Sequence, residues 1–226
     1  MDILDGIPVE FKLEELLKRL GMSKELAKRL DIEGLWRTAM SMIHPKALYT
    51  TAYITNRRET ALDIGEVRLA SRVLTRNLEK VKQVFPYIVT IGKTLEDESS
   101  KCESTLQRLY LETAGDLALT SARVRLEKYL SESYGLGNMS HMGPGQLDWA
   151  ITEQKQLFSI FGDVQASLGV RLTDSFLMIP RKSISGIIFP TETPFVSCQL
   201  CPRKDCSSRE VAYSESLRRS YGLDSE

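Results

Sequence analysis

Helix-like and strand-like segments of this sequence follow one another without the regular strand–helix–strand alternation that a parallel sheet requires. Four segments have the β-branched and aromatic residues typical of strands: 47–55, 84–92, 170–180 and 184–190. A long run with helical leucine spacing, residues 95–134, separates the first two from the last two. Elements in this irregular order favour an antiparallel sheet with flanking helices. We therefore predict the α+β class.

The remaining elements follow from the same periodicities and from the positions of glycine and proline. We expect an N-terminal helical part over 1–45, a strand or turn at 61–64, and helices over 65–77, 152–162 and 207–223. The long run over 95–134 should break or bend near Gly115. Segments 170–180 and 184–190 should pair with each other as a hairpin.

Length and composition indicate a globular protein in which one large or two small domains would fit, and we expect a single domain over residues 1–226. The chain is 42% hydrophobic and 27% charged, which is unlike a disordered protein. Thirty basic residues balance thirty acidic ones, so we expect no nucleic-acid partner. The sequence contains no apolar run long enough to span a membrane, and its first residues are unlike a secretory signal. These features predict a cytoplasmic protein without a membrane partner.

Three cysteines lie close together near the C-terminal end of the sequence. Cys198, Cys201 and Cys206 fall within nine residues, and 196–226 is predicted to hold this cluster and a terminal helix. A CxxC pair with a third nearby thiolate can bind zinc or an iron–sulfur cluster, which normally need four ligands. The fourth ligand would be Cys102 or an external ligand, with His141 or His44 as further alternatives for zinc. The alternative is three reduced thiols on a surface turn.

A glycine-rich stretch, residues 135–148, is the other candidate site. Long loops inside a compact domain are often functional, and glycine lets a backbone approach a ligand closely. The motif Gly143-Pro144-Gly145-Gln146 matches neither a Walker loop nor a dinucleotide-binding motif. His141, which precedes it, can donate or accept a proton or bind a metal. The candidate ligand-binding residues are therefore His141, Pro144, Gly145 and Gln146.

Several short motifs between residues 140 and 195 occur in an order that is typical of one family. They are Pro144-Gly145, Glu153-Gln154, Leu157-Phe158, the nonapeptide LTDSFLMIP at 172–180, Ser183-Ile184-Ser185-Gly186 and Phe189. In these motifs the chain resembles the activation domain of vitamin B12-dependent methionine synthase, which binds S-adenosylmethionine (SAM) and serves in reactivation. It looks like a stand-alone relative with an added C-terminal cysteine cluster.

The resemblance implies a C-shaped domain with a twisted antiparallel sheet. It also implies docking against a cobalamin-binding domain, so that inactive cob(II)alamin can be reduced and remethylated. The family's SAM groove has an arginine, a tyrosine and a further aromatic residue, whose places fall at His141, Gln146 and Pro194. An imidazole cannot replace the bidentate, permanently charged fork of a guanidinium. We therefore predict that SAM binds weakly or not at all.

The function that the resemblance implies is that of a partner or accessory protein in corrinoid-dependent methyl transfer. Cobalamin would be met only through a partner, such as a corrinoid protein or a cobalamin-binding domain. An iron–sulfur cluster at the cysteines could supply the low-potential electron for Co(II). Two alternatives stay open: a methyltransferase subunit in methionine synthesis, and a binding module in which zinc stabilises the C-terminal segment.

Overall fold

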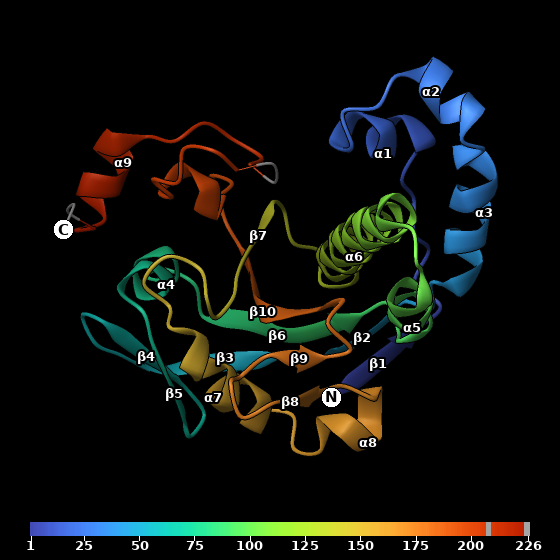
Figure 1. Ribbon diagram of the computed structural model, residues 1–226. Helices are drawn as coiled ribbons and strands as arrows, with labels where there is room; N and C mark the ends of the chain where they lie inside the picture. Colours follow the sequence, from blue (N-terminus) through green and yellow to red (C-terminus); the bar gives the residue numbers. More distant parts are fainter. Residues whose placement is uncertain (207–208, 224–226) are drawn as a thin grey trace.

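The sheet is built around strand β6 (Gln83–Thr90), in which seven of the eight residues are buried. One edge of β6 pairs with β10 (Ser183–Pro190). The other edge pairs with β2 (Lys46–Tyr49) and with β3 (Ala52–Arg57) in succession. The computed structural model describes residues 1–206 and 209–223, and the sheet extends from β6 in both directions (Figure 1).

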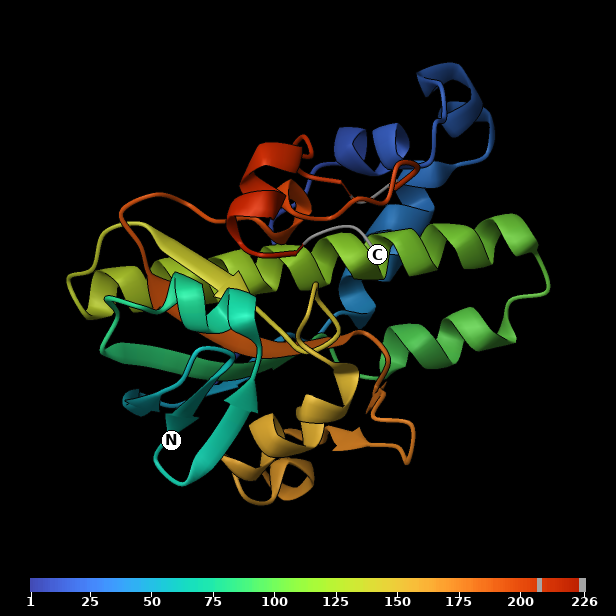
Figure 2. The same cartoon turned by 90° about the vertical axis from the view of Figure 1, so that its left-hand side faces the viewer.

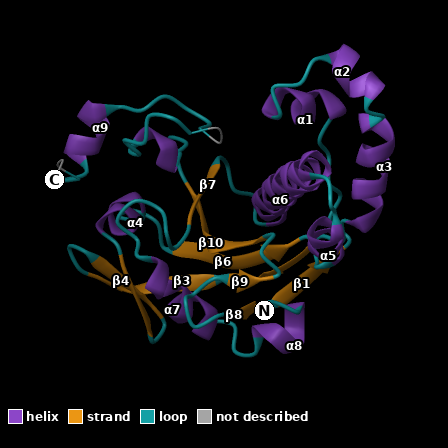
Figure 3. Cartoon of the chain, viewed as in Figure 1, coloured by secondary structure: helices purple, strands orange, loops and turns teal. Residues whose placement is uncertain are grey.

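The outer strands complete a sheet of eight strands. β1 (Asp2–Asp5) extends it beyond β2, while β4 (Ala61–Ile64) and β5 (Val67–Ala70) extend it beyond β3. β7 (Met139–Met142) pairs with the other edge of β10. Every strand pair in the described part of the chain is antiparallel. The sheet curls between layers of helices (Figure 3), which confirms the predicted α+β class.

Helix α6 (Thr105–Ser133) covers one face of this sheet along its length (Figure 2). Successive side chains of a strand point to opposite faces, so alternate residues of β6 share a face. The residues that join β6 to α6 are Phe85, Tyr87, Val89, Ala122 and Leu126. Full burial of one such large apolar side chain stabilises the fold by about 1.5–3 kcal/mol.

Two short helices cover the opposite face. They are α7 (Gln154–Ser159) and α8 (Val164–Leu168), and α7 is preceded by the 3₁₀ turn η1 (Ile151–Glu153). Leu48 and Ile88 of the sheet pack there against Phe158 and Phe161. The sheet is therefore buried on both faces at its centre, which explains why β6 reads as an almost continuous apolar run.

The N-terminal helices and the C-terminal segment stand on opposite sides of α6, which gives the molecule an open C-shaped outline in Figure 1. The N-terminal helices are α1 (Leu13–Arg19), α2 (Lys24–Arg29) and α3 (Ile32–Met42), within the part predicted to be helical. They pack on α5 (Thr94–Lys101) and α6. That prediction is wrong for residues 2–5, which pair with β2 as strand β1. The C-terminal segment holds the 3₁₀ turn η2 (Ser197–Gln199) and helix α9 (Glu215–Ser220). In the described residues no helix combines the length and the apolar character needed to cross a membrane.

Several helix predictions are wrong in their boundaries. The predicted helix over 65–77 is β5 followed by α4 (Arg72–Asn77), because Gly65, with φ of 57°, turns the chain back from β4 into β5. The long helical run breaks between Lys101 and Thr105, not near Gly115. Gly115 lies inside continuous α6, where a Cβ would be 3.1 Å from the Leu95 side chain.

The strand predictions also need correction. Segments 170–180 and 184–190 do not pair: β8 (Arg171–Leu172) pairs with β9 (Met178–Ile179), while β10 joins the main sheet. Segment 47–55 forms two strands, and the stretch 135–148 contains β7. In the predicted helix 152–162, α7 ends at Ser159. Of the predicted helix 207–223, only α9 is helical among the described residues, and 207–208 lie outside them.

Candidate functional site at the Pro-Gly loop

The loop of residues 143–150, here called the PG loop, begins where the backbones of β7 and β10 approach most closely. A Cβ on Gly143 would lie 2.4 Å from the carbonyl oxygen of Ser185. A Cβ on Gly186 would lie 2.4 Å from the carbonyl oxygen of Met142. Real side chains do not tolerate such distances, so both positions require glycine. Gly143 thus serves the contact between two strands, whereas the sequence suggested an approach to a ligand.

Two acidic side chains fix the PG loop and the turn after it to the neighbouring helix and strand. Asp148 accepts hydrogen bonds from the Ser71 hydroxyl at 2.7 Å and from the Arg72 amide at 2.6 Å, at the start of α4. Glu153 accepts one from the Ala70 amide at 2.9 Å. Asp148 was not singled out from the sequence, and Glu153 was named only as part of a family motif, because the partners of both lie more than seventy positions away. The loop is therefore anchored to α4 and β5 by side-chain hydrogen bonds.

Gln146 connects the PG loop to the C-terminal segment. Its Oε1 accepts hydrogen bonds from the Gly143 amide at 3.1 Å and from the Ser197 hydroxyl at 3.0 Å. Gly145, with φ of 88°, makes the turn beneath it, and a Cβ there would meet Ile151 at 3.2 Å. Both residues thus shape the loop in which the sequence placed them.

A pocket of about 340 Å³ opens beside the PG loop, between α7, the β8–β9 hairpin and the start of β10; we call it the loop pocket. Its wall includes Pro144, Gln146, Ile151, Gln154, Leu177 and Ser185. Such a mostly apolar hollow with a few convergent polar groups is typical of a ligand site. Pro144 and Gln146, two of the four residues predicted from the sequence, line it.

His141 points away from this pocket, toward α6. It pairs with Ile188 of β10, which packs on the α6 side of the sheet. Its Nδ1 lies 2.9 Å from Oε1 of Glu127 and 2.9 Å from Nη1 of Arg123, and Arg123 also pairs with Glu127. Arg123 is only 6% exposed. His141 therefore belongs to a buried charge network between α6 and β7.

The network lowers the pKa of its acidic residue, Glu127. Burial raises the pKa of Glu127, but the hydrogen bond with His141 and the charge of Arg123 outweigh it, so that the pKa lies below its ordinary value. Glu127 is thus held in its ionised form. Nearby, burial raises the pKa of Tyr87, whose hydroxyl has no hydrogen-bond partner among the described residues.

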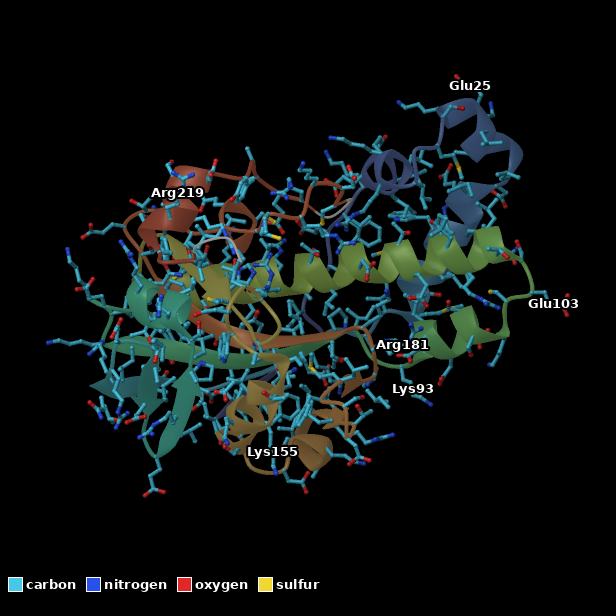
Figure 4. All side chains as sticks on the ribbon, turned by 60° about the vertical axis from the view of Figure 1, so that its left-hand side comes forward. Glu25, Lys93, Glu103, Lys155, Arg181 and Arg219 are labelled. Carbon is cyan, nitrogen blue, oxygen red and sulfur yellow. The ribbon has the colours of Figure 1, made fainter. Side chains whose placement is uncertain are left out.

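A second charge network closes the other end of the loop pocket. Arg181 donates to Glu96 and to Glu112 at 2.9 Å, and Lys182 contacts Glu112 at 2.9 Å. Figure 4 shows Arg181 beside α5, the helix that carries Glu96. Burial raises the pKa of Glu112, but hydrogen bonds from Lys182 and Ser99 bring it below its ordinary value. Local sequence contains no signal for this pairing.

The three clustered cysteines lie on a turn that an arginine organises. The Cys201 amide donates to the Cys198 carbonyl at 3.3 Å, and the Arg209 guanidinium donates to the carbonyls of both residues at 3.1 and 3.2 Å. All four cysteines of the chain are free and partly exposed, and Cys102 caps the C-terminal end of α5 rather than lying within a helix. Among the described residues, no group of three or more His, Cys, Asp or Glu side chains is arranged to hold a metal ion. The predicted metal site at Cys198, Cys201 and Cys206 stays a prediction.

A larger hollow, of about 930 Å³, lies between α4 and α9. Pro194, Phe195, Asn138 and Tyr221 are part of its wall. Pro194 is the third position that the resemblance assigned to a SAM groove. Pro194 lines this hollow, Gln146 lines the loop pocket, and His141 lines neither. The three positions that the resemblance assigned to one SAM groove therefore do not line a common pocket.

The family model of the vitamin B12 dependent methionine synthase activation domain matches residues 123–197. The chain resembles this activation domain. The match runs from the C-terminal half of α6 through the PG loop to η2, and so contains most of the residues that form the candidate site. The resemblance inferred from short motifs is thereby confirmed.

The fold agrees with the same family. Thirteen solved chains match, among them the crystal structure of the MetH reactivation domain bound to AdoHcy. That match has a TM-score of 0.59 and 14% sequence identity, and covers 87% of this chain and 81% of that chain. At this identity the likeness demonstrates a shared fold. No curated protein matches the sequence.

Proposed function

We propose that this chain is an accessory partner in corrinoid-dependent methyl transfer, which docks against a cobalamin-binding domain and supports reactivation of its corrinoid. The observation that carries the proposal is the family match over residues 123–197. The matched segment forms the PG loop and most of the loop pocket, so the resemblance falls on a surface with binding features.

Exposed apolar residues beside the loop pocket support docking. Leu177 is 60% exposed and Ile151 is 41% exposed. Leu177 follows Phe176, which has a left-handed φ of 62° at the tip of the β8–β9 hairpin. Such a backbone conformation costs about 1–3 kcal/mol in a residue other than glycine and is found preferentially at functional sites. Neighbouring exposed apolar side chains are typical of interaction surfaces.

We further propose that SAM binds this chain weakly or not at all. The position that the resemblance assigns to a carboxylate-binding arginine is His141, whose Nδ1 contacts Glu127 and Arg123. The neighbouring Arg123 is already paired with Glu127, so a carboxylate brought to this place would compete with the negative charge of Glu127. Calorimetric titration of the wild-type protein with SAM should therefore give no binding in the low micromolar range. An affinity in that range would contradict the proposal.

A metal or iron–sulfur centre at Cys198, Cys201 and Cys206 is a separate proposal, and zinc stabilisation of the C-terminal segment is its simplest form. Its support is the CxxCxxxxC spacing in the sequence. The turn between Cys198 and Cys201 is also already closed by a backbone hydrogen bond. A centre would require the three thiols to converge further than they do among the described residues.

The docking proposal is tested by calorimetric titration with a cobalamin-loaded cobalamin-binding domain of a B12-dependent methionine synthase. We expect binding by the wild type and a loss of at least about tenfold in affinity for Leu177→Asp, which puts a charge in the apolar patch. Leu109→Asp is the matched control, because Leu109 is 52% exposed and lies outside the matched segment. Equal affinities for the two variants would contradict docking through the β8–β9 hairpin.

A further inference from the structure

The loop pocket contains two glutamine side chains whose oxygens are already occupied. Oε1 of Gln154 accepts a hydrogen bond from the Ser185 hydroxyl at 3.0 Å. Oε1 of Gln146 accepts from the Gly143 amide and the Ser197 hydroxyl. A backbone N–H can only donate, which fixes the orientation of the Gln146 amide. The two glutamines come from different elements, α7 and the PG loop, and meet at one pocket.

The amide nitrogens of these glutamines have no partner within the described part of the chain. Gln154 is only 2% exposed, yet its Nε2 makes no hydrogen bond within the described residues. Gln146 is half-buried, and its Nε2 likewise has no partner in the described part of the chain. Buried polar groups are almost always hydrogen-bonded. Each of these nitrogens therefore offers an N–H donor to an occupant of the pocket.

The pocket has no unpaired charge with which to bind an ion. Arg181 is the one charged residue among its described lining residues, and its guanidinium is already paired with Glu96 and Glu112. A carboxylate or phosphate would lose its hydration in this pocket without gaining a counter-charge. An uncharged oxygen acceptor would lose much less hydration free energy on entering the pocket.

The remaining wall is largely apolar, apart from the hydroxyls of Ser183 and Ser185. Ile151, Phe176, Leu177, Met178 and Ile184 line the pocket on the sides away from the amides. Its volume of about 340 Å³ is near the lower end of that of ligand pockets. An occupant must therefore combine an uncharged acceptor oxygen with an apolar framework.

We infer that the loop pocket binds a neutral carboxamide or carbonyl group carried on an apolar framework, with Nε2 of Gln146 and Gln154 donating to its oxygen. Two sources have this chemistry. One is the edge of a corrin ring, whose apolar macrocycle carries carboxamide side chains. The other is a small apolar amide unrelated to corrinoids. The inference does not depend on the proposed function, because a simple amide can test it.

The test uses three probes: benzamide, its anionic counterpart benzoate, and dicyanocobinamide, which carries carboxamides on a corrin. Binding is followed by NMR through the side-chain amide signals of Gln146 and Gln154, and by equilibrium dialysis for the corrinoid. We expect benzamide to shift both signals, and benzoate to bind at least about tenfold more weakly because its charge is uncompensated. Binding of dicyanocobinamide in addition would identify the corrin edge as the natural source, and its absence would favour the small amide.

Matched variants separate the pocket from the rest of the molecule. Gln154→Glu keeps an acceptor for Ser185 but replaces the free N–H donor by an acceptor, so benzamide affinity should fall at least about tenfold. Gln156→Glu makes the same change on the exposed side of α7 and should leave the benzamide affinity unaltered. If Gln154→Glu fails to fold, Gln146→Glu provides the same test from the PG loop. Equal binding of benzoate and benzamide, no binding of either, or unchanged affinity in the folded variant would overturn the inference.

Discussion

At the scale of single residues, Glu127 lies between the Arg123 guanidinium and the His141 imidazole, where α6 meets β7. The sequence directed attention to His141 because histidine is scarce and this one lies near glycines. It did not reveal Arg123 or Glu127 as its partners. Their spacing of four residues marks one helix face, but nothing local shows that β7 crosses that face. A strand of four residues is also too short to show its period of two.

We predict that Glu127→Gln destabilises the fold at neutral pH by about 3 kcal/mol, because it leaves the nearly buried Arg123 without its counter-charge. The pKa of Glu127 is lower in the folded protein than in the unfolded chain. Its ionised form therefore stabilises the fold above the ordinary value of 4.5, and this contribution is lost as the pH falls through the folded value.

Urea unfolding between pH 3 and 7 measures this effect. The loss of stability on acidification below about pH 4.5 should be shallower in Glu127→Gln than in the wild type. Glu132→Gln, a change at an exposed glutamate of the same helix, should behave like the wild type. Parallel acid limbs for the wild type and Glu127→Gln would show that Glu127 is not held in its ionised form.

At the scale of elements, the sequence indicated most helices and strands but not the pairing of the strands. The LTDSFLMIP segment and the strand after it looked like the two arms of a hairpin. In the structure the first folds on itself as β8 and β9, while β10 pairs with β6 and β7. The alternation of apolar and polar residues shows which side chains of a strand share a face. It does not show which distant strand is the pairing partner, as β6 is for β10. Gly186 was the one local hint, since a glycine inside a strand indicates a close backbone approach.

The contact between β7 and β10 yields a prediction of its own. Gly143→Ala should destabilise the fold by about 3 kcal/mol, because its Cβ would have to occupy the space of the Ser185 carbonyl oxygen. The matched control is Gly137→Ala, since Gly137 precedes the same strand and a Cβ there meets nothing within 4 Å. Urea unfolding compares the two. Equal stabilities would mean that the strands do not approach as closely as described.

Metal binding by the three clustered cysteines can be tested by single substitutions. If Cys198, Cys201 and Cys206 jointly bind a metal, any one Cys→Ser change should remove most of it, because three ligands leave no redundancy. Cys102→Ser serves as the comparison, since Cys102 lies at the end of α5 and its thiol donates to the Glu98 carbonyl at 3.4 Å. Anaerobic zinc, iron and sulfide analysis is the measurement. A metal-free wild type with four titratable thiols would contradict a metal centre.

At the scale of the whole molecule, the order of the elements predicted the α+β class, whereas the C-shaped outline was expected only from the resemblance of residues 140–195. The family match then covers residues 123–197, while the N-terminal helices and α9 lie outside it. Those outer parts pack on α6 and α4 through apolar contacts. Leucine spacing shows that a helix has an apolar face, but it does not show which element that face contacts. The positions of the N-terminal helices and of α9 relative to the rest of the fold therefore could not be predicted from the sequence.

Sedimentation velocity of this protein mixed with a cobalamin-loaded cobalamin-binding domain of a B12-dependent methionine synthase tests the docking claim most directly. We expect a faster-sedimenting species that contains both polypeptides and the corrinoid absorbance. Independent sedimentation of the two proteins at concentrations up to about 100 μM, far above what a specific interface requires, would contradict it.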